Sequence, residues 1–214
     1  MNKTIAKEVI GGGLSDTSKM PSYSINLSAL DCITGSKLVN VEDSVCFGCY
    51  ALNGNYKRYN LPLKMQLSGK TQNINKLEWV EAVVHLIDNQ GNKKDKNYFR
   101  WHDSGDLQSI EHLEKIVEVC LLTPTVKHWL PTREYKIVND FIKNGGKIPR
   151  NLVIRFSAHM VDQKPPKTRF NTSTVHKNKS FIGNECESYK NENQCGTCRD
   201  CWNPSIKNIS YKYH

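Results

Sequence analysis

The chain has 214 residues, which suits one domain with enough length for a real hydrophobic core. Its formal charge of +9 and apolar fraction of 38% describe a folded protein with a basic, well-solvated surface. No stretch reaches the roughly 18 apolar residues that a membrane span needs, and the first residues lack the apolar run of a secretion signal. We therefore expect a cytoplasmic protein with no membrane partner.

The first third of the chain shows little regular pattern. Residues 1–31 contain a triple glycine and several small polar residues, which predict an irregular lead-in with weak strand character at 23–27. Residues 32–74 are expected to be rich in loops. A helix is then expected from Asn75 to about Asn89, because apolar residues recur every three or four positions, at Leu77, Val80, Val84 and Ile87.

Strands and helices alternate after this point. Strands are expected at 97–101, 126–130 and 152–157, and helices at 110–122, capped by Ser109, and at 134–144. Such alternation is typical of βαβ units around a parallel sheet. A closed barrel takes about 250 residues, so the sequence predicts an α/β fold with a partial (β/α) barrel or a small parallel sheet. We expect a core domain over 1–180 and a loop-rich, cysteine-containing segment over 181–214 packed on it.

Each of the three strands ends in a polar stretch. The first is followed by "HDSGD" (102–106), the second by Thr132, Arg133 and Glu134, and the third by Ser157 and His159. The carboxyl ends of parallel strands share one edge of the sheet, where ligands bind, so these stretches should converge. A helix cap also uses Asp and Ser, but rarely His, two Asp and Gly together. The candidate catalytic residues are His102, Asp103, Asp106, Arg133 and His159; the last two could equally make structural hydrogen bonds.

The eight cysteines form two groups and one single residue. One group is Cys32, Cys46 and Cys49, spaced C-x13-C-x2-C; the other is Cys186, Cys195, Cys198 and Cys201, spaced C-x8-C-x2-C-x2-C. Cys120, on the apolar face of a predicted helix, is expected to be a core residue. Because thiols stay reduced in the cytoplasm, the two groups indicate metal ligands rather than disulfides.

The second group suits a closed site. C-x2-C-x2-C packs three thiolates as densely as the ligand run of bacterial ferredoxins, which favours a 4Fe-4S cluster, although four thiolates also bind zinc. Four protein ligands leave no open position, so such a site would be structural or would carry electrons.

The first group counts only three cysteines. A cube-shaped cluster held by three thiolates keeps one iron free for an outside ligand, which is how an iron–sulfur site becomes a catalyst. The alternative is that Cys46 and Cys49 share one metal with two of the C-terminal cysteines. The positive charge leaves a further alternative, in which zinc or a closed cluster stabilises a protein that binds nucleic acid or transfers electrons without catalysis.

Four stretches, in this order, resemble a phage family called gene product 88: "SKMPSYSINL" (18–27), "CFGCYAL" (46–52), "RWHDSGDL" (100–107) and "CGTCRDCW" (195–202). The C-x2-C-Y-A element is also similar to that of a second phage family, which in turn resembles radical S-adenosylmethionine (SAM) enzymes. In those enzymes the usual spacing is C-x3-C-x2-C with an aromatic residue before the third cysteine. Gly48 stands at that position here, and the first gap is thirteen residues.

The resemblance to radical SAM enzymes implies a partial barrel in which Cys32, Cys46 and Cys49 carry a 4Fe-4S cluster whose open iron binds SAM. One-electron reduction by an outside reductant would then give a radical that abstracts hydrogen from an unknown substrate. Ser104, Gly105 and Tyr50 would help to hold the cofactor, and Arg133 or His159 would face the substrate. A protein encoded by a phage would act in the host cytoplasm.

Overall fold

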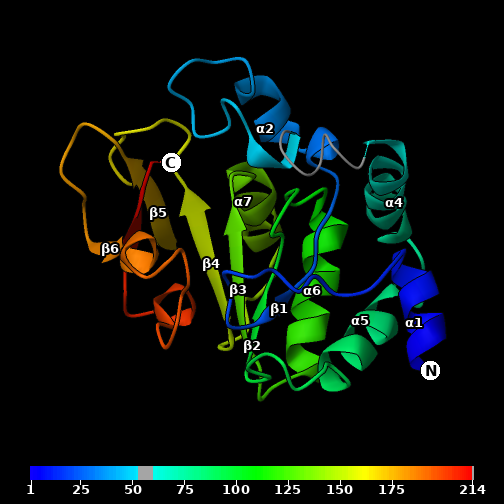
Figure 1. Cartoon of the computed structure of the whole chain (residues 1–214). Coiled ribbons are helices and arrows are strands. Elements are labelled where there is room, and N and C mark those ends of the chain that lie inside the picture. Colours follow the sequence, from blue (N-terminus) through cyan, green and yellow to red (C-terminus); the bar gives the residue numbers. More distant parts are fainter. Residues whose placement is uncertain (53–59, 214) are drawn as a thin grey trace.

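In the described part of the chain, residues 1–52 and 60–213 of the computed structural model, seven parallel strands form one curled sheet (Figure 1). The strand order is β1-β2-β3-β4-β5-β7-β6. The sheet curls into a half-barrel, which confirms the predicted α/β partial barrel. The strands are β1 Tyr23–Ser24, β2 Tyr98–Arg100, β3 Lys127–Thr132, β4 Leu152–Ser157, β5 Asn171–His176, β6 Asn184–Cys186 and β7 Asn208–Lys212.

Helices connect the first four strands. The α-helices are α1 Lys3–Ile10, α2 Ile33–Leu38, α4 Asn60–Asn73, α5 Trp79–Asp88, α6 Ile110–Leu122 and α7 Tyr135–Lys143. Four short 3-10 helices are η1 Ala29–Asp31, η2 Tyr50–Leu52, η3 Glu187–Lys190 and η4 Asp200–Trp202. The crossovers from β2 to β3 and from β3 to β4 run through α6 and α7, as in βαβ units. The Ser109 hydroxyl accepts from His112 N at 3.1 Å and caps α6 as predicted.

Several predicted boundaries were wrong. The lead-in at 1–31 contains α1, which Asn2 caps and Gly11 ends in the left-handed region. The helix expected from Asn75 begins instead at Trp79, and Leu77, placed on its buried face, is 92% exposed. The expected loop-rich stretch 32–74 contains α2 and α4, while its residues 53–59 lie outside the described residues.

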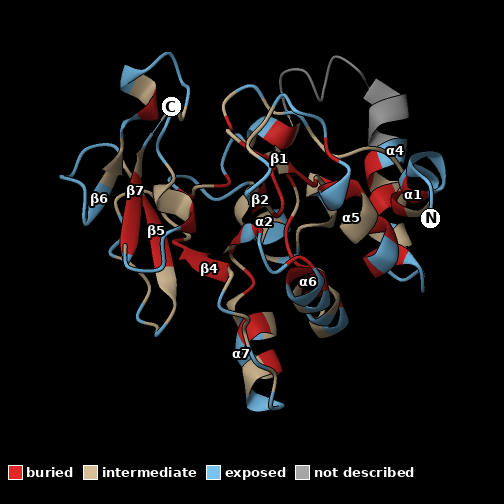
Figure 2. Ribbon diagram, turned by 90° about the horizontal axis from the view of Figure 1, so that it is seen from below, coloured by how far each residue is buried: buried red, intermediate tan, exposed pale blue. Residues whose placement is uncertain are grey.

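The two faces of the sheet are covered differently. On one face, Leu130, Ile154 and Phe156 join apolar residues of α1, α5, α6 and α7 in the main core, which includes the fully buried Cys120. We call this the helix face. Side chains alternate along a strand, so Trp129 points to the opposite face, where it packs with Met20 and Trp202. Figure 2 shows the buried residues running along the strands and along one side of the helices.

The carboxyl-terminal segment covers the opposite face. Its strands β6 and β7 belong to the same sheet, since β7 pairs with β5 from Asn208 to Lys212. Between β6 and β7 lie η3, η4 and three of the cysteines. No helix among residues 1–52 and 60–213 is long and apolar enough to cross a bilayer.

Candidate metal centres

The three cysteines of the first group lie together beside α2. Cys32 immediately precedes α2, and Cys46 and Cys49 lie on the turn before η2. The Sγ atoms of Cys32 and Cys46 are 3.6 Å and 3.8 Å from the point that a Cβ atom on Gly35 would occupy. Two thiols that are fourteen positions apart in the sequence are therefore neighbours in space.

A tight turn sets the spacing of Cys46 and Cys49. The amide of Cys49 donates to the carbonyl of Cys46 at 3.1 Å, and Gly48 has φ +65°. A positive φ at the third residue is that of a type II turn, which favours glycine. This explains why Gly48 occupies a position at which radical SAM enzymes carry an aromatic residue.

Hydrogen bonds fasten both cysteine loops to the carboxyl edge of the sheet. The Glu134 carboxylate, just after β3, accepts from the amide and the hydroxyl of Thr34 at 2.7 Å and 2.9 Å. After β4, the carbonyl of His159 accepts from Val45 N at 2.9 Å. The first group therefore lies over the ends of β3 and β4.

The polar stretches that follow β2 and β3 meet at Asp106. Its carboxylate accepts from the Thr132 hydroxyl at 2.6 Å, from Arg133 N at 2.9 Å and from Leu107 N at 2.8 Å. Burial raises the pKa of Asp106 to about 6, although these hydrogen bonds oppose the shift. Because both carboxylate oxygens already have donors, Asp106 positions the loops rather than presenting a free oxygen.

Arg133 brings a positive charge to Cys32 and Cys46. Its Nε is buried and has no hydrogen-bond partner within the described residues. Burial and the nearby Asp106 raise the pKa of Cys32 to about 12, and Arg133 lowers it. Burial also raises the pKa of Cys46, and Arg133 again opposes the shift. A buried group of thiolates needs positive partners, and Arg133 supplies one of them.

His159 stands next to this group. Its ring stacks on Tyr135 with centroids 4.8 Å apart and an angle of 18° between the planes. Its Nε2 is buried and lacks a hydrogen-bond partner in the part of the chain that the structure describes. Burial raises the pKa of Tyr135 to about 12, so the phenol stays neutral near pH 7.

The other residues of the 102–106 turn have different surroundings. His102, at φ +55°, lies on the helix face with its ring 5.2 Å from that of His112. Burial lowers its pKa well below the usual value. Burial raises the pKa of Asp103, although the nearby Arg100 and Lys70 oppose the shift.

Three predicted cofactor residues hold the turn in place. The Ser104 hydroxyl donates to the carbonyl of Leu27 at 2.8 Å. Gly105 has φ +77°, and a Cβ atom there would lie 2.6 Å from the Leu27 Cβ, so only glycine fits. The Tyr50 hydroxyl donates to the carbonyl of Asp103. These contacts tie the turn to the segment after β1 and to the loop that carries Cys49.

The second group lies on the opposite face, where two of its cysteines are beside Tyr211. In the β6–β7 pair, Cys186 is the partner of Tyr211, whose hydroxyl lies 3.5 Å from the Sγ of Cys201. Cys195 and Cys201 pack against the cluster of Met20, Trp129 and Trp202. The two groups are carried by segments in different parts of the molecule, near α2 and near β6 (Figure 1). This arrangement favours two sites over one shared site.

Sequence reasoning missed Arg155. It lies in the middle of β4 with 0% exposure and donates five hydrogen bonds to carbonyl oxygens, those of Thr172, Asp200, Cys201, Asn203 and Ile206. Four of these carbonyls belong to the segment after Cys198. The one signal in the sequence was a lone arginine inside an apolar strand, which alone does not identify its partners.

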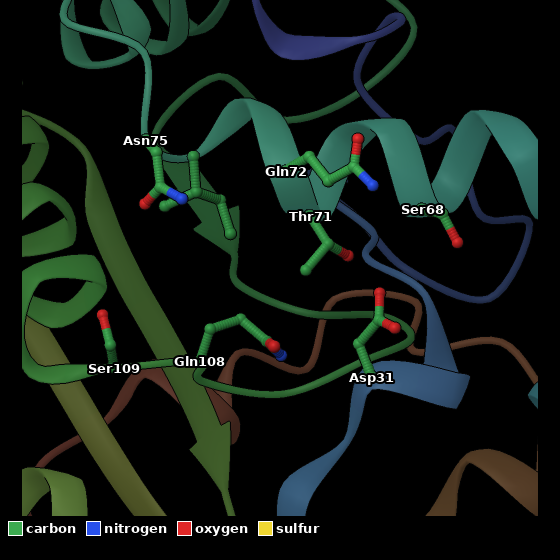
Figure 3. A pocket seen from close by; sticks show the side chains of 8 residues that line it. Asp31, Ser68, Thr71, Gln72, Asn75, Gln108 and Ser109 are labelled. Carbon is green, nitrogen blue, oxygen red and sulfur yellow. The ribbon is translucent and has the colours of Figure 1, made fainter.

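A polar cavity of about 420 Å³ lies beside the first group. Figure 3 shows Asp31 and Gln108 on one side of it and Ser68, Thr71 and Gln72 of α4 on the other. Asp31 directly precedes Cys32, and Gln108 follows Asp106 by two positions. The cavity is lined by Asp31, Ser68, Thr71, Gln72, Ile74, Asn75, Gln108 and Ser109.

Among the described residues, no three His, Cys, Asp or Glu side chains are arranged so that they could hold a metal ion. The donors that a cluster would need are nevertheless close together. The first group offers three thiols, two of them near Arg133, and the second offers four thiols, of which Cys186 and Cys201 lie beside Tyr211. The chemistry of both donor sets fits thiolate-ligated metal.

The fold and site define a parallel α/β half-barrel with one cysteine group at the carboxyl edge of its sheet and another against a sheet face. The chain belongs to the family described as gene product 88, whose match spans residues 2–206. Comparisons with curated proteins and with solved structures give no match.

Proposed function

We propose that Cys32, Cys46 and Cys49 hold a 4Fe-4S cluster with one iron free of protein ligands, in a SAM-dependent radical enzyme whose substrate is undefined. The observation that supports this is the convergence of three thiols, from two separate loops, at the carboxyl edge of a half-barrel. Ligands of parallel α/β proteins bind at this edge. When bound and reduced, such a cluster supplies the electron that splits the sulfonium of SAM.

Arg133 is the residue best placed to bind an anionic group. Its charge acts on Cys32 and Cys46, and its Nε has no partner within residues 1–52 and 60–213. A guanidinium pairs with a carboxylate through two parallel hydrogen bonds. We assign Arg133 to a carboxylate of SAM or of the substrate.

His159 is the candidate for proton transfer. Its Nε2 has no hydrogen-bond partner among residues 1–52 and 60–213, and Tyr135 holds the ring in place by stacking. An imidazole nitrogen can serve as a general acid or base towards a bound substrate. Asp106 acts as a positioning residue, since its hydrogen bonds to Thr132 and Arg133 fix the end of β3.

The cavity beside Cys32 gives room for an organic ligand. Its volume of about 420 Å³ is within the range of small-molecule sites. Its walls offer one carboxylate, Asp31, and several amides and hydroxyls, which suit hydroxyl or amino groups. We assign to it a polar part of the cofactor or of the substrate.

The test is anaerobic purification followed by reduction with dithionite in the presence of SAM. We expect a brown protein that contains iron and sulfide and releases 5′-deoxyadenosine. The Cys49→Ser variant should lose this release, whereas Cys120→Ala, which removes a core cysteine, should keep it. A colourless protein with zinc and no iron would refute the cluster. Iron without 5′-deoxyadenosine would refute the radical activity and favour electron transfer.

A further inference from the structure

The proposed function leaves the second cysteine group without a role. Its members come from two places: Cys186 ends β6, whereas Cys195 and Cys198 lie between η3 and η4 and Cys201 lies in η4. The Cys195–Cys198 turn is closed by the amide of Cys198, which donates to the carbonyl of Cys195 at 3.0 Å, with Gly196 at φ +53°. As in the first group, a glycine in the left-handed region lets a C-x2-C turn form.

Tyr211 links the two places. Strand pairing sets Cys186 beside Tyr211, and the Tyr211 hydroxyl contacts the Sγ of Cys201 at 3.5 Å. Cys201 and Tyr211 are both partly buried. A hydroxyl that can donate to sulfur is a typical neighbour of a metal-bound thiolate.

Two members of the group also share an apolar support. Cys195 and Cys201 both pack against the cluster of Met20, Trp129 and Trp202 on the opposite face.

Several other contacts hold the segment that carries the group, among them the ion pair of Arg199 with Asp95 at 3.1 Å. The Arg155 guanidinium holds four of its carbonyls, Trp202 Nε1 donates to the carbonyl of Phe99 at 2.8 Å, and Cys195 N donates to the carbonyl of Lys19 at 3.1 Å. Between η3 and η4 the chain has no regular structure of its own. A bridge from Cys186 to the other three cysteines would close this loop.

We propose that Cys186, Cys195, Cys198 and Cys201 together bind an iron–sulfur cluster, separate from the first group, which fastens the carboxyl-terminal segment to the opposite face of the sheet. Four thiolates occupy every iron of a cubane cluster, so this centre has no position for substrate. Because binding occurs only when the four thiols are brought together, its free energy adds to that of folding. The inference stands on its own residues and does not depend on the activity of the first group.

Iron and sulfide per chain in the full-length protein test the inference. In a triple variant, Cys32→Ser, Cys46→Ser and Cys49→Ser, we expect anaerobic reconstitution with iron and sulfide to restore about one 4Fe-4S cluster per chain. The Cys120→Ala variant is the control for a lost cysteine and should hold as much iron as the unmodified chain. Zinc in place of iron in the triple variant would overturn the cluster, and no metal at all would overturn the site.

Amide hydrogen exchange tests the fastening role without a substitution in the second group. In the triple variant, removal of iron with a chelator should speed exchange at least tenfold at Trp202, Asn203 and Ile206, whose amides are hydrogen-bonded within the segment. Amides of β3 should change little. Equal exchange with and without iron would overturn the fastening role, whatever the first group does.

Discussion

The two cysteine groups differ in count and in place, and the difference indicates different chemistry. The first has three thiols at an open edge, beside an unpartnered Arg133 Nε in the described structure and a polar cavity. The second has four thiols against a sheet face, supported by Tyr211 and Arg155. The same C-x2-C turn is used in both, so the turn alone does not decide the function. The number of cysteines in each group and the side chains around them decide the function.

The largest effect should come from Arg155, which supports only the second group. Arg155→Met keeps most of the buried volume but removes five hydrogen bonds to carbonyl oxygens, of which those of Asp200, Asn203 and Ile206 keep a second donor. We expect the free energy of unfolding to fall by about 5 kcal/mol, since each unmade buried hydrogen bond costs about 1–3 kcal/mol and the losses are only partly additive. Urea denaturation measures this.

The exposed Arg150→Met is the matched control and should change stability by less than about 0.5 kcal/mol. In the folded fraction of Arg155→Met, iron should be lost from the second group before the first. Loss of iron from the first group alone would contradict the claim that Arg155 supports only the second group.

Acid should destabilise both cysteine groups together, because both depend on the same fold, which packing on the helix face stabilises. Burial lowers the pKa of His112 and of His128 to about 3, from an unfolded value of 6.5. Both histidines bind protons more readily in the unfolded chain, so the stability that they contribute is lost as the pH falls below 6.5. From pH 7.5 to 5.5 the two should lower the free energy of unfolding by roughly 3 kcal/mol.

Asp106 opposes part of this loss. Its pKa is raised to about 6, so the folded protein takes up a proton there first and gains about 1 kcal/mol by pH 5.5. His112 Nδ1 accepts from Gln108 N, and an asparagine oxygen can replace that acceptor. Chemical denaturation of His112→Asn at several pH values should therefore show an acid loss that is smaller by about 1.4 kcal/mol than in the unmodified chain. An unchanged pH profile would contradict this account.

Asp106 supports the first group, as Arg155 supports the second. In Asp106→Asn, an amide NH₂ replaces one of two oxygens that accept from Thr132, Arg133 and Leu107, so at least one donor loses its partner. We expect a loss of about 2 kcal/mol in urea denaturation. Asp31→Asn, at the cavity wall, is the control and should stay within about 0.5 kcal/mol. Iron at the second group should be unaffected.

The smallest effect should be at Gly48. Its φ of +65° strains any other residue, but a Cβ atom there would meet nothing within 4 Å. Gly48→Ala should therefore cost only about 1 kcal/mol. Gly105→Ala, at a similar φ, would also place its Cβ 2.6 Å from that of Leu27 and should cost more in the same thermal denaturation assay. Equal losses at the two positions would contradict the role given to Leu27.

The sequence predicted the middle of the fold better than its ends. Apolar strands with polar ends, such as 152–157, stand out because burial on both faces leaves an uninterrupted apolar run. Strands β5 and β7 lack that signal. Their buried hydroxyls pair with one another instead, as Thr174 does with Ser210 at 3.1 Å, and such pairing depends on a partner 36 positions away.

The candidate site shows the same limit. The spacing of the cysteines predicted two groups, and the polar strand ends predicted the edge at which Asp106 and Arg133 meet. The orientation of single side chains could not be predicted, because it depends on packing. His102 lies against His112 on the helix face, although its neighbours in sequence hold the turn beside the first group.

The most direct test of the two-site account is the electron paramagnetic resonance spectrum of a variant that keeps only the first group. Cys195→Ser with Cys198→Ser, reconstituted and reduced without oxygen, should show a 4Fe-4S signal that shifts when SAM is added, because a free iron can take the new ligand. A variant without iron, or a signal that SAM leaves unchanged, would contradict an open cluster at Cys32, Cys46 and Cys49.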